Sequence, residues 1–301
     1  MFFKYMHKSV LLDEAIDSLC IKDGGIYVDG TCGFGGHSFE IAKRNEKGIV
    51  VVLDKDTFAL GETVKKLSSL KTKTFSYNGG FEDMQKILES FSIKKVDGIL
   101  LDLGISSYQL DSSKRGFTFR YDEDLLMTMK QDPTKEDLTA YDVVNTWSKD
   151  SLEAIISGFG EEKFYKRIVA GIVSARDISP IKTTSQLVEI IQNSVPGFYR
   201  KGKIHPATKT FQAIRMAVNG ELSSLENFLS KVTDLLNTNG VVSIISFHSL
   251  EDRMVKRAFI DLEKRGLGTR ITKKPIVPSS SEIKENPRSR SAKLRVFKKV
   301  Q

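Results

Sequence analysis

The sequence predicts an α/β fold in which a mostly parallel, seven-stranded sheet of the doubly wound type is interrupted by an all-α insert. A β-rich run at residues 26–28 leads into a glycine turn and then into helical spacing from Ser38. Further buried-strand runs follow at 48–53, 99–101 and 241–247. Between the last two, the strand pattern stops for about a hundred residues and amphipathic helical patterns replace it.

These patterns predict a discontinuous sheet domain made of residues 1–111 and 210–301, with residues 112–209 as a helical insert for substrate recognition. A chain of 301 residues with 40% hydrophobic content can bury one large core and a smaller one. Its apolar runs have the length of strands, and its first residues do not form a signal peptide. We therefore expect a cytoplasmic protein without membrane contact.

The first helix should place Leu12, Ala15, Ile16 and Leu19 on one face, with Ser9 as its cap. The two cysteines, Cys20 and Cys32, stand outside any metal-ligand spacing. Neither a disulfide nor a metal site is expected.

The glycine turn after residue 28 is the first candidate site. Asp29 begins an Asp-x-x-x-Gly-x-Gly pattern that ends at Gly35, and Gly36 and His37 open the following helix. Glycine lets the backbone approach a ligand, and the free N–H groups of a helix start face it. The pattern resembles the loop of S-adenosylmethionine-dependent methyltransferases. Nicotinamide dinucleotide binding and a turn without a ligand remain open alternatives.

The second strand ends in Asp54, 18 residues after Gly36, where a carboxylate would accept hydrogen bonds from ribose hydroxyls. A helix at 56–70 and a third strand at 74–77 then lead to the turn before Phe81. Phe81 could stack on an adenine ring or plug the core beneath the turn.

Asp102 follows the buried strand at 99–101 and should open toward the ligand edge of the sheet. The lone pair of an exocyclic amine is delocalised into its ring, so methylation there needs an acceptor that holds the amine hydrogens. Asp102 is the leading catalytic candidate for that role. The alternative is that Asp102 caps its own loop through backbone N–H groups.

Later segments offer candidates for substrate contact. Arg215 and Asn219 share one face of a helix predicted at 210–222, where they could contact substrate or fix the insert in a buried network. His248 follows the fifth strand, next to a Ser249–Asp252 capping box, and a structural role is the alternative for it. The predicted insert helices are 122–129, 138–146, 151–157, 161–174 and 184–193, and Lys163, Lys166 and Arg167 form a flank for RNA or solvent.

The C-terminal region carries the positive charge. Residues 255–301 contain 14 Lys and Arg against 4 Asp and Glu, whereas the whole chain has a net charge of +8. Two closing strands are predicted at 270–274 and 293–299, joined by a loop at 275–287. Arg288 and Arg290 at the end of this loop could bind phosphate. A polyanion partner and a solubilising tail both explain the charge.

Several motifs together resemble the bacterial family of small-subunit (16S) ribosomal RNA cytosine-N(4) methyltransferases, the methyltransferase H or MraW-like family. The matching segments cover nearly the whole chain in order: 7–15, 25–31, 33 with 35–38, 97–104, 106–107 with 109–111, 115–117, 205–208 with 210–213, 243–253 and 286–288.

This resemblance implies a Rossmann-like domain that transfers methyl from S-adenosylmethionine to a decoding-centre cytidine. It also implies 16S ribosomal RNA in a small-subunit particle as partner, and it leaves a homodimer open. By position, it implies cofactor contacts at Gly35, Gly36, His37, Asp54, Phe81, Asp102 and Gln109. Asp102 is followed by Leu103-Gly104 rather than the Asp-Pro-Pro-Tyr of many amino-methyltransferases, so that signature's mechanism transfers by analogy alone.

Three rival functions remain open at this point. Cys32 could attack a pyrimidine ring as a thiolate, although no accompanying base motif supports it. The chain could be a non-catalytic RNA-binding protein that retains the fold. It could also be a nicotinamide-dependent oxidoreductase.

Overall fold

The computed structural model describes residues 9–300, which fall into two compact units. The sheet unit extends to Gly104 and resumes at Leu222, and the helical unit is Ile105–Glu221. The helical unit is therefore longer at both ends than the predicted insert, 112–209. The reason is packing, because Leu110 near the start and Phe211 and Ile214 near the end belong to the apolar core of the helical unit.

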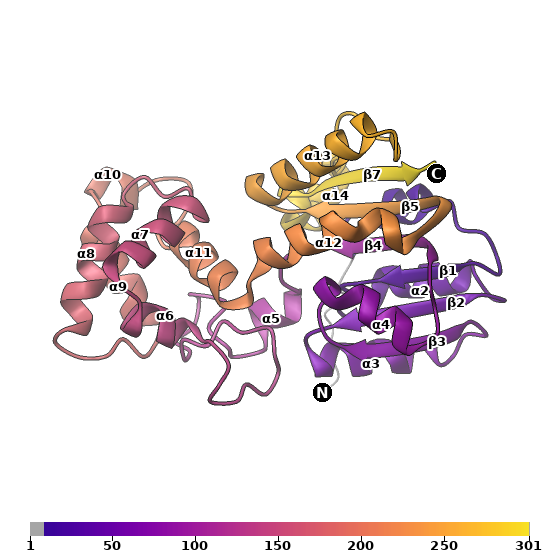
Figure 1. Ribbon diagram of the computed structural model, residues 1–301. Helices are drawn as coiled ribbons and strands as arrows, with labels where there is room; N and C mark the ends of the chain where they lie inside the picture. The colour runs from indigo at the N-terminus through magenta and orange to yellow at the C-terminus, as the bar shows by residue number, and fades with distance from the viewer. Residues whose placement is uncertain (1–8, 301) are drawn as a thin grey trace. The chain divides into compact units, whose positions relative to one another are not determined.

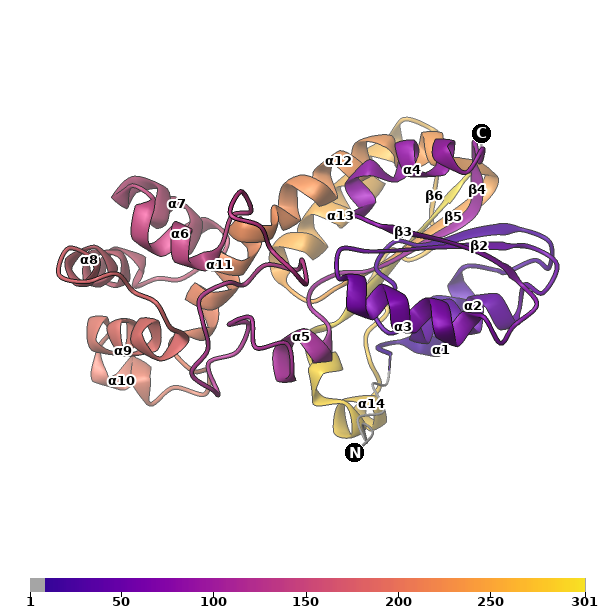
Figure 2. The same ribbon diagram turned by 90° about the horizontal axis from the view of Figure 1, so that it is seen from below.

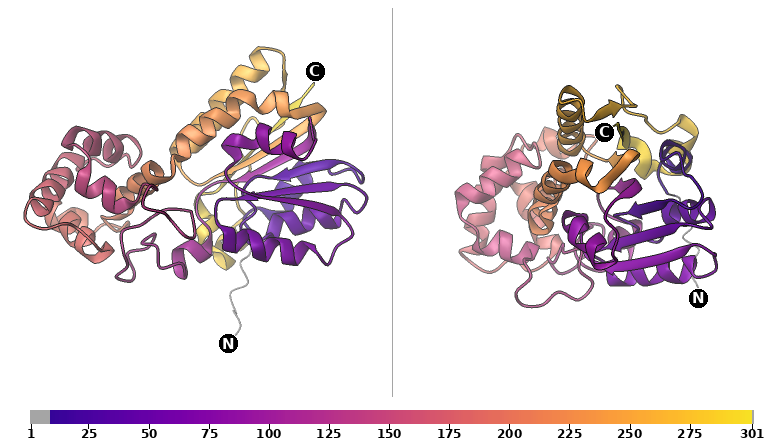
Figure 3. Two further views of the ribbon diagram at one scale, coloured as in Figure 1. Left: turned by 60° about the horizontal axis from the view of Figure 1, so that its bottom comes forward. Right: turned by 45° about the vertical axis from the view of Figure 1, so that its right-hand side comes forward.

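The seven-stranded sheet predicted from the sequence is confirmed, with the order β3-β2-β1-β4-β5-β7-β6 (Figure 1). Only β7 runs antiparallel to its neighbours β5 and β6 among the described strands. The strands are β1 Ile26–Asp29, β2 Ile49–Asp54, β3 Lys73–Asn78, β4 Val96–Asp102, β5 Leu236–Ser246, β6 Gly268–Arg270 and β7 Lys293–Lys299. Figure 3 shows that the first and last parts of the chain contribute to this one sheet.

Both faces of the sheet are covered by helices, which explains the nearly continuous apolar runs of its central strands. Alternate residues enter opposite cores: Val51 and Leu53 pack on one side, and Val50 and Val52 pack on the other. Figure 2 shows one group of helices on each face. One face carries α1 Leu12–Ser18, α2 Gly36–Lys43 and α3 Thr57–Leu67, and the other carries α4 Met84–Ser90, α12 Glu221–Leu235 and α13 Ser249–Lys264.

Ser9 does not cap the first helix as predicted. Leu11 holds the N-cap position with a left-handed φ of 51° and no side-chain cap. Its backbone N–H donates instead to Glu282 Oε1 at 2.8 Å. The capping partner therefore comes from a segment 271 residues away, which local spacing could not reveal.

The predicted loop at 275–287 contains helix α14, Ser280–Glu285, which begins at a Ser279 cap. The 3-10 helix η2, Pro287–Ser291, follows it. The strand predicted at 270–274 is also displaced, because β6 ends at Arg270.

The helical unit has its own apolar core, separate from the two cores of the sheet unit. The predicted helix at 122–129 is absent, because Leu125 N–H donates to Lys182 O at 3.1 Å and Met127 has a left-handed φ of 51°. Within residues 9–300, no helix combines the length and apolar character of a membrane span. The helices of this unit are α5 Ser107–Asp111, α6 Ala140–Thr146, α7 Lys149–Gly158, α8 Tyr165–Arg176, α9 Thr184–Ser194, α10 Gly197–Arg200 and α11 Thr208–Asn219.

Candidate cofactor and active site

The glycine loop joins β1 to α2 and requires glycine at three positions. Gly33 and Gly35 have left-handed φ values of 50° and 71°, which side chains other than glycine adopt at a cost. Gly35 is the N-cap of α2, and a Cβ on Gly36 would overlap Ser9 Oγ. Glycine is therefore needed here for the backbone conformation and for close packing against Ser9 and Thr63. The predicted cofactor contacts of Gly35 and Gly36 stay predictions.

Asp54, at the end of β2, holds this loop in place. Its Oδ2 accepts from Gly33 N–H at 2.8 Å, and its Oδ1 accepts from Asp56 N–H at 2.8 Å. Both carboxylate oxygens of Asp54 therefore bond to the backbone around the glycine loop. Its ribose contact stays a prediction, and the structure adds a role in organising the loop.

Asp29, at the end of β1, is only 1% exposed, and the sequence did not single it out as a site residue. Its carboxylate accepts from Ser38 Oγ at 2.5 Å and from Thr31 N–H at 3.2 Å. Burial nevertheless raises the pKa of Asp29 to about 6, and the nearby Asp54 charge adds to the rise. A proton binds here far more readily than at an ordinary aspartate.

Asp102 ends β4, beside β1, and its backbone N–H donates to Thr31 Oγ1 at 2.6 Å. Its Oδ1 is buried and has no hydrogen-bond partner among the described residues. Burial raises the pKa of Asp102 well above its usual range, and the charges of Asp29 and Glu251 raise it further. The structure therefore supplies a buried acceptor that no residue within 9–300 satisfies.

His37 lies next to this carboxylate, with Nδ1 3.8 Å from Asp102 Oδ2. Its other nitrogen, Nε2, lies 3.0 Å from the Val10 carbonyl oxygen, which can only accept, so Nε2 carries a hydrogen. This hydrogen bond ties the His37 ring to the segment that precedes α1. The predicted cofactor contact of His37 stays a prediction.

Phe81 begins the 3-10 helix η1, Phe81–Asp83, after the turn that follows β3. The Phe81 ring packs edge-on against that of Phe228, with the ring centres 5.8 Å apart. Phe81 also lies close to Gly30, because a Cβ built on that glycine would come within 3.2 Å of Phe81 Cβ. The half-buried Phe81 therefore supports the core and also lies beside the end of β1. Both roles considered from the sequence are compatible with this position.

Gln109 belongs to the helical unit and is buried in α5. Its Oε1 accepts from Ser106 N–H at 2.9 Å, and Ser106 Oγ accepts from Gln109 N–H at 3.2 Å. This reciprocal capping box fixes the start of α5. The predicted cofactor contact of Gln109 stays a prediction.

Arg215 and Asn219, on α11, each have partners inside the helical unit. Arg215 Nε and Nη2 donate to the two carboxylate oxygens of Glu221, each at 2.8 Å. Asn219 donates to Met127 O at 2.7 Å and accepts from Met129 N–H at 2.8 Å. These contacts support the structural alternative considered from the sequence, and substrate contact stays a prediction.

His248 caps α13, so the predicted Ser249–Asp252 box is wrong by one residue. His248 Nδ1 accepts from Glu251 N–H at 3.5 Å, and Glu251 Oε2 accepts from Phe247 N–H at 3.0 Å. Asp252 instead pairs with Arg295 on β7 at 2.6 Å. This pairing with a distant strand takes Asp252 out of the cap, and substrate contact by His248 stays a prediction.

Arg288 and Arg290 are both exposed on η2, whereas Ser289 between them is buried. Ser289 Oγ donates to Asn286 O at 2.8 Å, which anchors the turn that presents the arginines. Their exposure is compatible with phosphate binding, which stays a prediction.

Thr63 is a buried contributor that the sequence did not reveal. It lies on α3, and its Oγ1 donates to Gly33 O at 2.6 Å. A Cβ on Gly35 would lie 2.9 Å from Thr63 Cγ2. The one available signal was a polar residue on the buried face of an amphipathic helix.

These residues fit S-adenosylmethionine. Asp29, Asp54 and Asp102 end the three adjacent strands β1, β2 and β4, so three carboxyl groups gather at one edge of the sheet, where a bound cation would favour their ionised forms. The cofactor carries positive charge on its sulfonium and ammonium groups and has ribose hydroxyls for Asp54. The unpartnered Asp102 Oδ1 adds an acceptor that neither the fold nor the loop uses.

Comparison with known proteins identifies a family model and relatives that match nearly the whole chain. A family model described as the MraW methylase family matches residues 4–300. The chain is 45% identical to the "Ribosomal RNA small subunit methyltransferase H" of Lachnospira eligens over 99% of this chain and 98% of that protein. The protein of the same name from Clostridium botulinum (strain Kyoto) is 46% identical over 99% and 100%. A solved rRNA methylase from Streptococcus thermophilus matches with a TM-score of 0.46 and 14% identity over 99% and 100%.

Proposed function

Because the chain belongs to the MraW methylase family, we propose that it methylates the N(4) amine of a decoding-centre cytidine in small-subunit ribosomal RNA. S-adenosylmethionine is the methyl donor. The names of the relatives, at 45–46% identity, support ribosomal RNA of the small subunit as the substrate. The choice of the amine nitrogen is supported by the chemistry of the site.

The observation that carries the proposal is the buried, unpartnered Oδ1 of Asp102. A cytosine amine is a poor nucleophile while its lone pair is conjugated with the ring. A carboxylate that accepts an amine hydrogen stabilises the transition state as the nitrogen loses that conjugation. Asp102 offers this acceptor at the end of β4, beside the glycine loop.

The bound cofactor would supply an electrophilic methyl group, whose bond to sulfur breaks as the nitrogen–carbon bond forms. The nitrogen must then release one proton. Asp102 receives this proton in its ionised form, which the positive charge of the bound cofactor would favour against the burial that raises the pKa of that carboxyl.

The rival carbon-methylation chemistry has little support at Cys32. This chemistry needs a thiolate nucleophile. Cys32 is 6% exposed, and burial raises the pKa of its thiol well above the usual range, with Asp54 and Asp29 adding to the rise. A thiolate is therefore disfavoured beside these two carboxylates.

The proposal is tested by nucleoside mass spectrometry. Small-subunit particles and naked 16S ribosomal RNA from cells that lack this chain would be incubated with the purified protein and labelled S-adenosylmethionine. We expect labelled N(4)-methylcytidine in one decoding-centre fragment, and none with Asp102→Asn in the same time. Labelled 5-methylcytidine, or binding of NAD without methyl transfer, would overturn the proposal.

A further inference from the structure

The helical unit carries an exposed surface in which aromatic rings lie next to basic side chains. We call it the Phe198 surface, and it consists of Lys163, Phe198, Tyr199, Arg200, Lys201 and Lys203. Phe198, on α10, is 69% exposed although it is a large apolar residue. One exposed apolar ring is unremarkable alone, but Phe198 has both aromatic and basic neighbours.

Lys163 lies among three aromatic rings. Its Nζ is 5.0 Å from the ring centre of Phe164, 5.1 Å from that of Tyr199 and 5.8 Å from that of Phe198. These distances are in the range of cation–π attraction. The ammonium group therefore holds the exposed Phe198 ring beside a fixed positive charge.

The base of this surface is well anchored. Tyr199 donates its hydroxyl hydrogen to Glu162 Oε2 at 2.5 Å, and Glu162 Oε1 accepts from Phe164 N–H at 2.8 Å. Glu162 is itself buried, so its charge is used internally and does not face solvent. The ring of Phe164 packs on that of Tyr199 at 4.9 Å. The Tyr199 and Phe164 rings beneath the exposed side chains are thus fixed by contacts within the unit.

Positive charge is concentrated along the same segment. Residues 198–204 contain no Asp or Glu, and their three cations, Arg200, Lys201 and Lys203, are all exposed. The helical unit as a whole is nearly neutral, with 16 Lys and Arg against 15 Asp and Glu in residues 105–221. The surface at 198–204 is therefore basic, although the net charge of the whole unit is close to zero.

We propose that the Phe198 surface binds an unpaired segment of the ribosomal RNA substrate, with a base stacked on Phe198 and phosphates held by Arg200 and Lys203. The proposal rests on the proposed function. Stacking on an exposed ring requires an unstacked base, so a duplex would not use Phe198. A protein partner fits less well, because lysine is depleted from the centres of protein interfaces.

The test is the affinity of the full chain for a labelled single-stranded RNA of 12 nucleotides and for the matching duplex. Phe198→Ala should weaken single-strand binding roughly 5- to 100-fold, the range for loss of one stacked base. Phe198→Tyr, which keeps a ring, should restore most of the affinity, whereas Phe198→Leu should not. The matched control is Ile178→Ala, because Ile178 is 88% exposed in the same unit.

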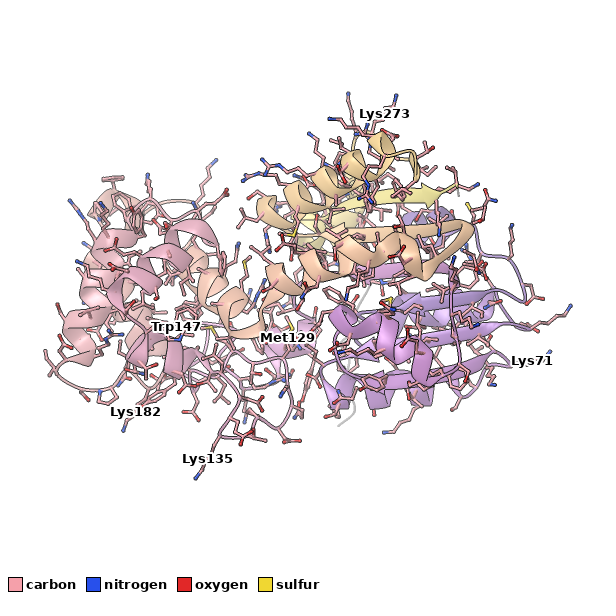
Figure 4. All side chains as sticks on the ribbon, in the orientation of Figure 1. Lys71, Met129, Lys135, Trp147, Lys182 and Lys273 are labelled. Carbon is pink, nitrogen blue, oxygen red and sulfur yellow. The ribbon has the colours of Figure 1, made fainter. Side chains whose placement is uncertain are left out.

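The charges are tested separately by salt dependence. Arg200→Gln with Lys203→Gln should flatten the slope of log affinity against log salt by about 1.4, at about 0.7 for each lost phosphate contact. Lys182→Gln is the control, since Lys182 is exposed elsewhere in the same unit and is labelled in Figure 4. It should leave the slope unchanged.

Three results would overturn this inference. The first is unchanged single-strand affinity in Phe198→Ala, and the second is an equal loss with the duplex. The third is a loss seen with small-subunit particles but not with RNA alone, which would identify a ribosomal protein as the partner. If the parent chain methylates cytidine while these variants bind RNA normally, this inference fails and the proposed function stands. If the parent does not methylate, the proposed function fails by itself.

Discussion

The buried Asp29 makes the stability of the sheet unit depend on pH in a direction opposite to that of most carboxylates. Its pKa is raised to about 6 in the folded protein, against about 3.9 in an unfolded chain. The stabilising contribution of the protonated form is complete below about pH 4. It is lost as the pH rises through about 6, because the folded state must then hold a buried charge.

The size of the effect follows from the shift. Two pKa units correspond to about 3 kcal/mol in the free energy of unfolding. Asp29→Asn keeps the shape, and its amide can still accept from Thr31 N–H and donate to Ser38 Oγ. Between pH 4 and pH 7 the free energy of unfolding of Asp29→Asn, minus that of the parent, should increase by about 2 kcal/mol, because the unfolded carboxyl is already about half ionised at pH 4.

The measurement must resolve the two units. Urea unfolding read by hydrogen exchange in peptides from β1 and β2 reports the sheet unit, whereas fluorescence of the single Trp147 reports the helical unit and is the internal control. Ser38→Ala removes a hydrogen bond that lowers the pKa of Asp29, so it should steepen the parent's pH dependence. Parallel curves for Asp29→Asn and the parent would refute the reasoning.

Three further predictions concern the site. Asp54→Ala should weaken S-adenosylmethionine binding by roughly 1.5–3 kcal/mol by calorimetry, and unchanged affinity in a folded variant would remove Asp54 from the cofactor site. Asp102→Asn should slow single-turnover methyl transfer by about 100-fold or more at saturating RNA and cofactor. Loss of cofactor binding with a normal saturated rate would instead make Asp102 a cofactor ligand only. Charge reversal at Arg288 and Arg290 should weaken RNA binding and flatten its salt dependence without changing cofactor affinity, and an unaltered slope would exclude this turn.

The parts of the fold that the sequence predicted correctly are those determined by short segments. The run 26–28, the glycine turn and the helix after it have their signals within about 15 residues. Asp54 and Asp102 followed in the same way, because each is the last residue of a buried strand. Strand ends of a parallel sheet meet at one edge, so the site followed from the topology.

The errors came from contacts between segments far apart in the sequence. The cap of Leu11 comes from Glu282, and the segment 122–129 bonds to residues near 182 instead of forming a helix. The sequence also did not reveal that Thr63 supports the glycine loop or that Lys163 lies among aromatic rings. Neither arrangement has a local pattern, since each requires two elements to be packed first.

The break in the sheet unit has a consequence for synthesis of the chain. β4 ends at Asp102, and its parallel neighbour β5 begins at Leu236, so 133 residues must be made between two adjacent central strands. If synthesis proceeds at roughly 5–20 residues per second, one edge of β4 remains unpaired for roughly 7–27 s before β5 is made. An open edge of a sheet is a template for pairing with another chain. The nascent protein is therefore most exposed to aggregation while the helical unit is being made, and a fragment ending before Leu236 should aggregate more readily than the full chain.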